Sequence, residues 1–196
     1  GSDQELINVL DPVVVEKSRD QALEKLRKAQ TSIGAFPWYP GGPASPYMTL
    51  LTMYGFSKAS EFKVEVPKDV VVRGWNYLAN HIHQTAWDES FVHFLTFLNY
   101  VASNYPDPSW MGNALPETER VKLLDLCFKH WKKLYPQLKF LLSLTLNRMK
   151  EPNKARLVFE SVMDSAKTTD DMGTYWAPED RAWLWYNDTV EKHAFF

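Results

Sequence analysis

The residues that could carry chemistry in this chain are few and lie far apart. Cys127 is the single cysteine, and with Asp125 and the distant His193 it supplies the residue types of a zinc site. Inside a helix, positions 125 and 127 point about 200° apart, so both side chains cannot hold one ion. Cys127 and His130 could share a face, but two ligands do not make a zinc site. We therefore expect no metal, no other cofactor and a buried structural thiol.

The other titratable residues do not form a catalytic pattern. His81 and His83 are two residues apart and would face different sides of a helix. Asp170 and Asp171 precede a glycine, which is typical of a turn. The sequence contains no glycine-rich phosphate loop, serine-centred elbow or paired-carboxylate pattern. We expect no catalytic residues and a chain that is not an enzyme.

Aromatic residues are abundant, with 8 Trp, 9 Tyr and 11 Phe, and two stretches concentrate them. Residues 34–46 and 172–186 contain four of the eight tryptophans. In the first stretch, prolines recur every third residue, which matches the turn of a polyproline II helix; they are Pro37, Pro40, Pro43 and Pro46. Aromatic rings in such loops could bind a partner, or they could plug the end of the fold. The candidate binding residues are Trp38, Tyr39, Tyr47, Trp176, Trp185 and Tyr186.

The composition limits the classes of protein to consider. At 196 residues and 45% hydrophobic residues, the chain can bury about 70% of its unfolded surface and needs no disulfide or metal to fold. The net charge is −2, with acids and bases interspersed and no polybasic run, which argues against nucleic acid as a partner. The longest apolar stretches, such as 141–146, are far shorter than the ~20 residues of a membrane span.

The spacing of apolar residues predicts an all-α fold. Apolar residues recur with helical period almost everywhere, and strand-like alternation is confined to Phe62, Val64 and Val66. Residues 88–104 are apolar around the whole circumference, which predicts a helix buried on all sides. The helix at 46–60 should begin with Ser45 as N-cap. Its apolar face should consist of Tyr47, Leu50, Leu51 and Tyr54. The predicted helices cover 15–29, 46–60, 67–85 and 88–104, begin at 116, 136 and 152, and end with one that starts near 187.

The helices form a repeating pattern. The apolar helices that begin at 46, 88, 136 and 187 are separated by 42, 48 and 51 residues, and a more polar helix lies between each pair. Such periods are typical of stacked helical hairpins, as in an α-solenoid or an α/α toroid with inner and outer helices. We expect residues 1–14 to be an N-terminal extension that begins with the cloning scar Gly1-Ser2. Residues 15–196 should form a single domain whose last helix is cut short.

The segment from Gln30 to Phe36 predicts a specific turn that closes a pair of helices, which we call the closure. A helix runs to Gln30, whose amide can bond backbone groups at the helix end. Gly34 permits a left-handed turn, and Phe36 can then fold back against the helices. This Gln-x-x-x-Gly-x-aromatic pattern resembles the repeat that closes helix pairs in α/α toroids such as terpene cyclases.

Longer runs resemble one family more closely. A helix ending in Gln30, the loop Gly34-Ala35-Phe36-Pro37-Trp38 and the helix start Ser45-Pro46-Tyr47-Met48-Thr49 are similar to the thioester-domain region of bacterial alpha-2-macroglobulin-like proteins. The later run Met172-Gly173-Thr174-Tyr175-Trp176, continued by residues 185–195, resembles the second glycine-aromatic loop of that family. The resemblance covers roughly residues 20–196.

The resemblance implies a function without catalysis. It implies an incomplete α/α toroid within a secreted or periplasmic protease-trapping protein, an endopeptidase inhibitor whose domains contact one another and a protease. The thioester of that family is built from Cys, any residue, Glu and Gln. Here Cys127 is followed by Phe128, Lys129 and His130, so no thioester can form from this sequence. We expect a thioester-less domain, periplasmic or extracellular, that acts by protein contact.

An enzyme on the same architecture is the alternative. Terpene cyclases, prenyltransferases and polysaccharide-degrading toroids use an aromatic-lined cavity, and the residues Asp125, Cys127 and His193 are of the same types as the zinc ligands of prenyltransferases. An enzyme of this kind should have a deep pocket on which Asp, Glu or His side chains converge.

Overall fold

The computed structural model describes residues 12–85, 91–105, 107–170 and 173–175. These residues form seven α-helices with little strand, which confirms the all-α fold. Most helix starts fall within three residues of the predicted positions, and the helix predicted from about residue 187 lies outside the described residues. The helices are α2 (Pro12–Ala29), α3 (Pro46–Glu61), α4 (Lys68–Gln84), α5 (Phe91–Ser103), α6 (Glu117–Lys129), α7 (Pro136–Arg148) and α8 (Pro152–Met163).

Two short β-hairpins and two 3-10 turns complete the described elements. Strand β1 (Phe36–Pro37) pairs antiparallel with β2 (Ala44–Ser45), and β3 (Lys167–Thr169) pairs with β4 (Gly173–Tyr175). The 3-10 turns are η1 (Pro108–Trp110) and η2 (Trp131–Lys133). The sequence predicted loops at both hairpins, because strands of two or three residues are too short for an alternating pattern. Asp170 lies in the turn between β3 and β4, as expected.

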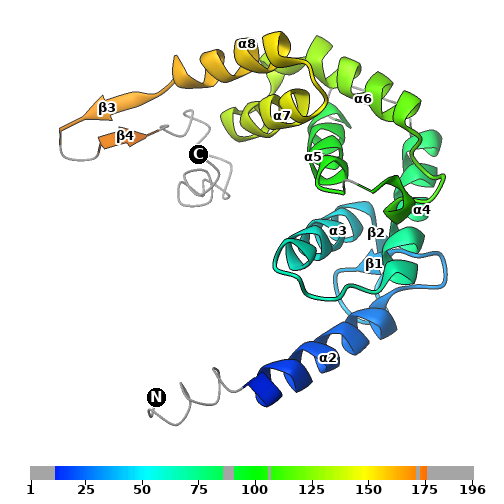
Figure 1. Cartoon of the computed structure of the whole chain (residues 1–196). Helices are drawn as coiled ribbons and strands as arrows, with labels where there is room; N and C mark the ends of the chain where they lie inside the picture. The colour runs from blue at the N-terminus through cyan, green and yellow to red at the C-terminus, as the bar shows by residue number, and fades with distance from the viewer. Residues whose placement is uncertain (1–11, 86–90, 106, 171–172, 176–196) are drawn as a thin grey trace. The chain divides into compact units, whose positions relative to one another are not determined.

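The chain divides into two compact units. The first contains residues Gly1–Thr85 and Asp107–Leu115, and in it α3 and η1 pack against α4 (Figure 1). The second contains Ala86–Pro106 and Pro116–Phe196. In the second unit α5 packs against both α6 and α7, and α7 packs against α8. No residue of α5 is exposed, but Phe91, His93, Phe94 and Phe97 on one side of it are only half-buried. The prediction of a helix buried on all sides is therefore confirmed only in part.

The core of the first unit lies between α3 and α4. The predicted inner residues of α4 are all fully buried; they are Val71, Trp75, Leu78 and Ile82. Gly74 allows close packing, because a Cβ there would lie 2.8 Å from Sδ of Met53. The predicted face of α3 is wrong in part. Leu50 is fully buried and Tyr54 is half-buried, but Tyr47 and Leu51 are exposed. Met53 and Phe56 are buried instead.

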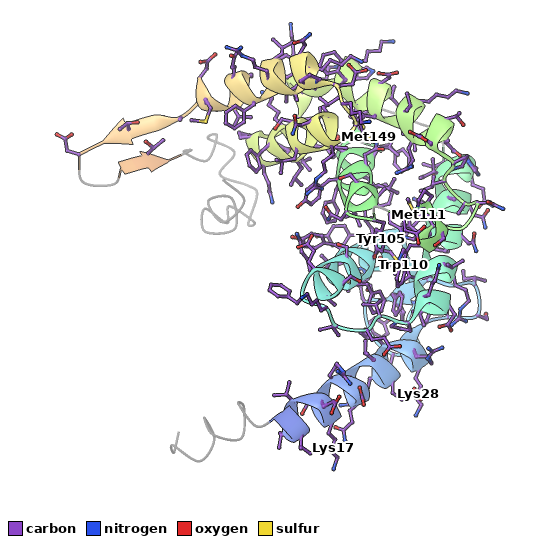
Figure 2. All side chains as sticks on the ribbon, in the orientation of Figure 1. Lys17, Lys28, Tyr105, Trp110, Met111 and Met149 are labelled. Atoms are coloured by element: carbon purple, nitrogen blue, oxygen red, sulfur yellow. The ribbon has the colours of Figure 1, made fainter. Side chains whose placement is uncertain are left out.

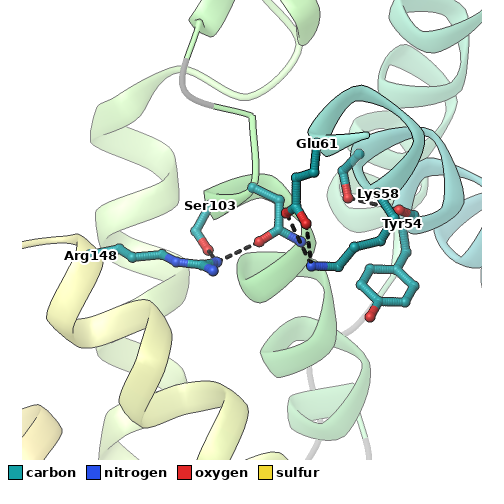
Figure 3. Close-up of polar contacts among 7 residues, drawn as sticks. Tyr54, Lys58, Glu61, Ser103 and Arg148 are labelled. Atoms are coloured by element: carbon teal, nitrogen blue, oxygen red, sulfur yellow. Dashed lines mark hydrogen bonds and ion pairs between the residues drawn. The ribbon is translucent and has the colours of Figure 1, made fainter. Parts of the chain in front are cut away.

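Polar contacts join the helices of the second unit. Arg148 at the end of α7 donates hydrogen bonds to Oγ of Ser103 (2.8 Å) and to Oδ1 of Asn104, at the end of α5 (Figure 3). Lys154 of α8 pairs with Asp125 of α6 at 3.2 Å. These contacts tie α7 to α5 and α8 to α6.

Helix α2 is a charged surface helix of the first unit. Lys17 and Lys28 project from it (Figure 2), and its contact with the rest of the unit includes a paired guanidinium and carboxylate, Arg27 and Asp69 of α4. Within the first unit, Lys58 and Glu61 pair across one turn of α3 (Figure 3). None of the helices in the described ranges is long and apolar enough to cross a membrane.

Candidate functional site

The side chain of Gln30 closes the junction where α2 ends. Its Nε2 donates to the backbone oxygens of Gly34 and Val70, each at 2.9 Å, and the side chain is buried. One amide therefore joins the end of α2, the following turn and the first turn of α4. The predicted bonding of the Gln30 amide to backbone groups is confirmed, and the bond to α4 adds a partner 40 residues away.

Gly34 occupies a position that no other residue fits. Its φ is +87°, in the left-handed region that favours glycine, and a Cβ on it would lie 2.4 Å from the backbone oxygen of Arg73. The turn brings Ala35 and Phe36 inward, where Phe36 is 3% exposed. The predicted left-handed turn and inward Phe36 are both confirmed.

The hairpin that follows is clamped to the start of α3. The backbone N–H of Phe36 donates to Oγ1 of Thr49 at 2.8 Å, and this hydroxyl donates to the backbone oxygen of Ser45 at 2.7 Å. Oγ of Ser45 accepts from the backbone N–H of Met48 and caps α3, as predicted. Buried Thr49 thus holds both strands of the hairpin.

The tip of the hairpin is a tight turn. The N–H of Gly42 donates to the oxygen of Tyr39 at 2.9 Å, and Gly41 has a φ of +77°. With Pro40 before Gly41, this is the pattern of a type II turn. The chain reverses here, so the polyproline II prediction for this stretch is wrong. The ring of Tyr39 lies over Gly42, where an added Cβ would be 3.0 Å from it.

The hairpin and α3 present large apolar side chains to solvent. Trp38 and Tyr39 are each 63% exposed, Tyr47 is 49% exposed and Leu51, one turn further along α3, is 39% exposed. The rings of Trp38 and Tyr47 stack with centroids 5.8 Å apart and an interplanar angle of 16°. We call these four residues the aromatic surface. Of the other candidate residues, Trp176, Trp185 and Tyr186 lie outside the described residues.

Cys127 is a buried thiol of the second unit. It is fully buried, and burial raises the pKa of the thiol to about 11. Asn99 approaches Sγ with its Nδ2 at 3.7 Å. Asp125 instead lies at the surface with Lys154, so the two side chains diverge as their spacing predicts. In the described ranges, no three His, Cys, Asp or Glu side chains are grouped so that they could hold a metal.

Each unit contains a hollow among its described residues. The first has an open groove of about 280 Å³ between α2 and residues 65–67, lined by side chains of both charges such as Arg19, Asp20 and Glu65. The second has an enclosed cavity of about 10 Å³, into which the buried Nε of Arg120 is brought without a hydrogen-bond partner among the described residues. The other residues that line this cavity are Asn99, Ser103, Leu124, Thr145 and Met149.

No family model and no curated protein matches this chain. The aromatic surface, with the closure that positions it, is the candidate functional site that the described residues define.

Proposed function

We propose that this chain is a non-catalytic domain of a bacterial alpha-2-macroglobulin-like protease-trapping protein and acts through protein contacts made by its aromatic surface. Its helices belong to an incomplete α/α toroid. The protein is periplasmic or extracellular, and the domain contacts other domains of its parent chain and a protease.

The exposure of Trp38, Tyr39 and Tyr47 is the observation that carries the proposal. Trp and Tyr dominate the energetics of protein interfaces because each ring buries a large area and loses little side-chain entropy. A monomer gains nothing by leaving stacked rings in water. The same rings become favourable when a partner covers them.

The aromatic surface is held in place before any partner arrives. Gln30 and Gly34 fix the start of the hairpin, and Thr49 fixes its two strands against α3. The ring stack of Trp38 on Tyr47 joins the hairpin to the helix. A surface ordered in this way avoids part of the entropy cost of binding. A rigid domain contact therefore suits it better than a flexible one.

The properties of Cys127 support a domain without a thioester. An internal thioester needs a cysteine and a glutamine side chain in contact, whereas Cys127 is buried beside Asn99 and the residues after it are Phe128, Lys129 and His130. Methylamine cleaves an intact thioester by forming an amide at its acyl carbon and releasing the cysteine as a free thiol. It should therefore not be incorporated into this domain of the parent protein and should release no thiol from Cys127. Incorporation of methylamine into the domain together with release of the Cys127 thiol would overturn this part of the proposal.

Titration calorimetry of this chain against the remaining domains of its parent tests the contact. The double variant Trp38→Ala/Tyr47→Ala should bind at least tenfold more weakly, because large rings at an interface each contribute more than about 1 kcal/mol. Phe62→Ala is the matched control, since Phe62 is an exposed aromatic of the same unit, 81% exposed and outside the aromatic surface. Equal affinities for the two variants would refute the role of the aromatic surface.

The protease contact needs a separate measurement. The parent protein mixed with trypsin should form a complex that excludes large substrates from the bound protease, and the double variant should form less of it. A soluble small-molecule product made by the chain alone, with a rate abolished by denaturation, would instead favour an enzyme.

A further inference from the structure

Lysines gather around Trp131 at the turn between α6 and α7. Trp131, Lys132 and Lys133 form η2, and Lys139 is the fourth residue of α7. The Nζ atoms of Lys139 and Lys132 lie 5.5 Å and 6.0 Å from the centre of the Trp131 ring. We call these four residues the basic cluster.

The segment that contains the basic cluster is rich in positive charge. Residues 126–150 contain six of the 22 Lys and Arg of the chain and none of its 24 Asp and Glu. In the part of the chain that the structure describes, neither Lys132 nor Lys139 has a carboxylate within ion-pair distance. Within a chain of net charge −2, residues 126–150 thus carry six positive charges and no negative charge.

The position of the basic cluster is unfavourable for the fold itself. The N-terminus of a helix carries a partial positive charge and favours acidic residues. Helices α4 and α6 have Asp69 and Glu117 in their first turns, whereas α7, like α2, α3, α5 and α8, has no acid there. Helix α7 also has no side-chain cap. Lys132 and Lys133 precede its uncapped end instead. A sequence that breaks a local rule in this way points to a role in binding.

We propose that the basic cluster is a contact site for a membrane surface that contains anionic phospholipids. Lysine ammonium groups bind lipid phosphates, and Trp and Tyr prefer the level of the headgroups, where one side of the ring is apolar and the other is wet. The cluster combines these types, since two ammonium groups lie near the ring of the half-buried Trp131. Tyr135, four residues further along the chain, is 37% exposed.

Sedimentation with lipid vesicles tests the proposal. The full chain should pellet with vesicles of equal parts phosphatidylglycerol and phosphatidylcholine, and should stay in solution with phosphatidylcholine alone. Each lysine near an anionic surface contributes about fivefold in binding, so the triple variant Lys132→Gln/Lys133→Gln/Lys139→Gln should bind about a hundredfold more weakly. Raising the salt concentration should release the unmodified chain, because screening weakens surface charge interactions.

Helix α2 offers a matched control. The triple variant Lys17→Gln/Lys25→Gln/Lys28→Gln removes the same charge from exposed lysines that alternate with acids, and it should bind vesicles as the unmodified chain does. Circular dichroism would confirm that both variants keep their helices. If the triple variant of the basic cluster fails to fold, the single variants Lys132→Gln and Lys139→Gln decide the result, since each should bind about fivefold more weakly.

Three outcomes would overturn the proposal. Equal losses for the two triple variants would mean that net charge alone controls binding. Equal binding to neutral and anionic vesicles would exclude an electrostatic contact. Binding to polyglutamate without binding to vesicles would identify an acidic protein as the partner. None of these outcomes bears on the aromatic surface, which belongs to the first unit.

Discussion

Three glycines of the first unit allow a graded test of the Gln30–Phe36 closure. Gly34 has a φ of +87°, and its Cα lies close to the backbone of Arg73. Gly41 has a φ of +77° and open space around it. Gly55 lies within α3, has no positive φ and also faces open space. Replacement by alanine therefore adds strain and a clash at the first position, strain alone at the second, and neither at the third.

The expected free energies follow from these differences. A left-handed φ costs an alanine about 1–2 kcal/mol. At Gly34 the new Cβ would lie 2.4 Å from Arg73 O, a backbone atom that cannot turn aside, and relieving such overpacking costs about 1–3 kcal/mol more. We expect Gly34→Ala to destabilise the chain by about 2–5 kcal/mol and Gly41→Ala by about 1–2 kcal/mol. Gly55→Ala should stabilise it by about 0.5–1 kcal/mol, because glycine is a poor helix former.

Urea unfolding of the full chain, followed by circular dichroism, measures these differences as shifts of the transition midpoint at constant slope. The order Gly55→Ala, unmodified, Gly41→Ala, Gly34→Ala is the expected order of decreasing stability. If Gly34→Ala is no less stable than Gly41→Ala, the close approach to α4 is absent, and the proposed rigidity of the hairpin loses its basis. If Gly55→Ala also destabilises, α3 is not a regular helix at this point.

Other features of the structure lead to further predictions. Because burial raises the pKa of the Cys127 thiol to about 11, a disulfide reagent at pH 8 should modify it slowly in the folded chain and quickly in urea, and equal rates would show that the thiol is accessible. The Arg27 side chain lowers the pKa of Asp69 below its ordinary value of 3.8. Their pairing should therefore stabilise the chain above that pH, and this stabilisation should be lost as the pH falls through the lowered pKa of the folded chain. Asp69→Asn should flatten this pH dependence of stability, and an unchanged acid unfolding profile would contradict the pairing. The small cavity beside Arg120 has room for about one water molecule, and the polar residues Asn99, Ser103 and Thr145 are among those that line it. A crystal structure should therefore contain an ordered water within hydrogen-bond distance of Arg120 Nε, and an empty cavity would contradict this assignment.

Helical periodicity predicts the core well where one face is clearly apolar. On α4 the spacing of Val71, Trp75, Leu78 and Ile82 allows a single buried stripe, and all four are fully buried. On α3 apolar residues occupy more than one stripe, and local spacing cannot choose between them. The structure buries Met53 and Phe56 because they face α4, and it leaves Tyr47 to pack on Trp38 from the hairpin. This choice depends on contacts that are distant in sequence.

Polar residues of the core are harder to predict than apolar ones. Thr49 and Ser57 are buried on α3 because their hydroxyls donate to the backbone oxygens of Ser45 and Tyr54. A scale of hydrophobicity places both at the surface. The closure at Gln30 was predictable, in contrast, because a terminal amide, a glycine and an aromatic residue at fixed spacing each have a local role. Its bond to Val70, 40 residues away, was not.

The basic cluster was missed for a similar reason. Residues 134–138 separate Lys132 and Lys133 from Lys139, so no polybasic run is visible, and a net charge near zero hides the lysines. The signal that could have found them is the absence of Asp and Glu from residues 126–150, since a solvated helix pair ordinarily carries both signs. A local charge balance is therefore more informative here than the total.

Both proposed surfaces depart from what stability alone would select. The hairpin uses Gln30, Gly34 and Thr49 to satisfy its backbone and then places Trp38 and Tyr39 in water, although smaller polar residues would suit an exposed turn. Helix α7 begins beside lysines where an acid or a capping hydroxyl would stabilise it. Both surfaces lie on well-ordered helices and turns, so neither results from poor packing. Where residues lower the stability of an otherwise consistent fold, binding to a partner is the physical reason for their presence.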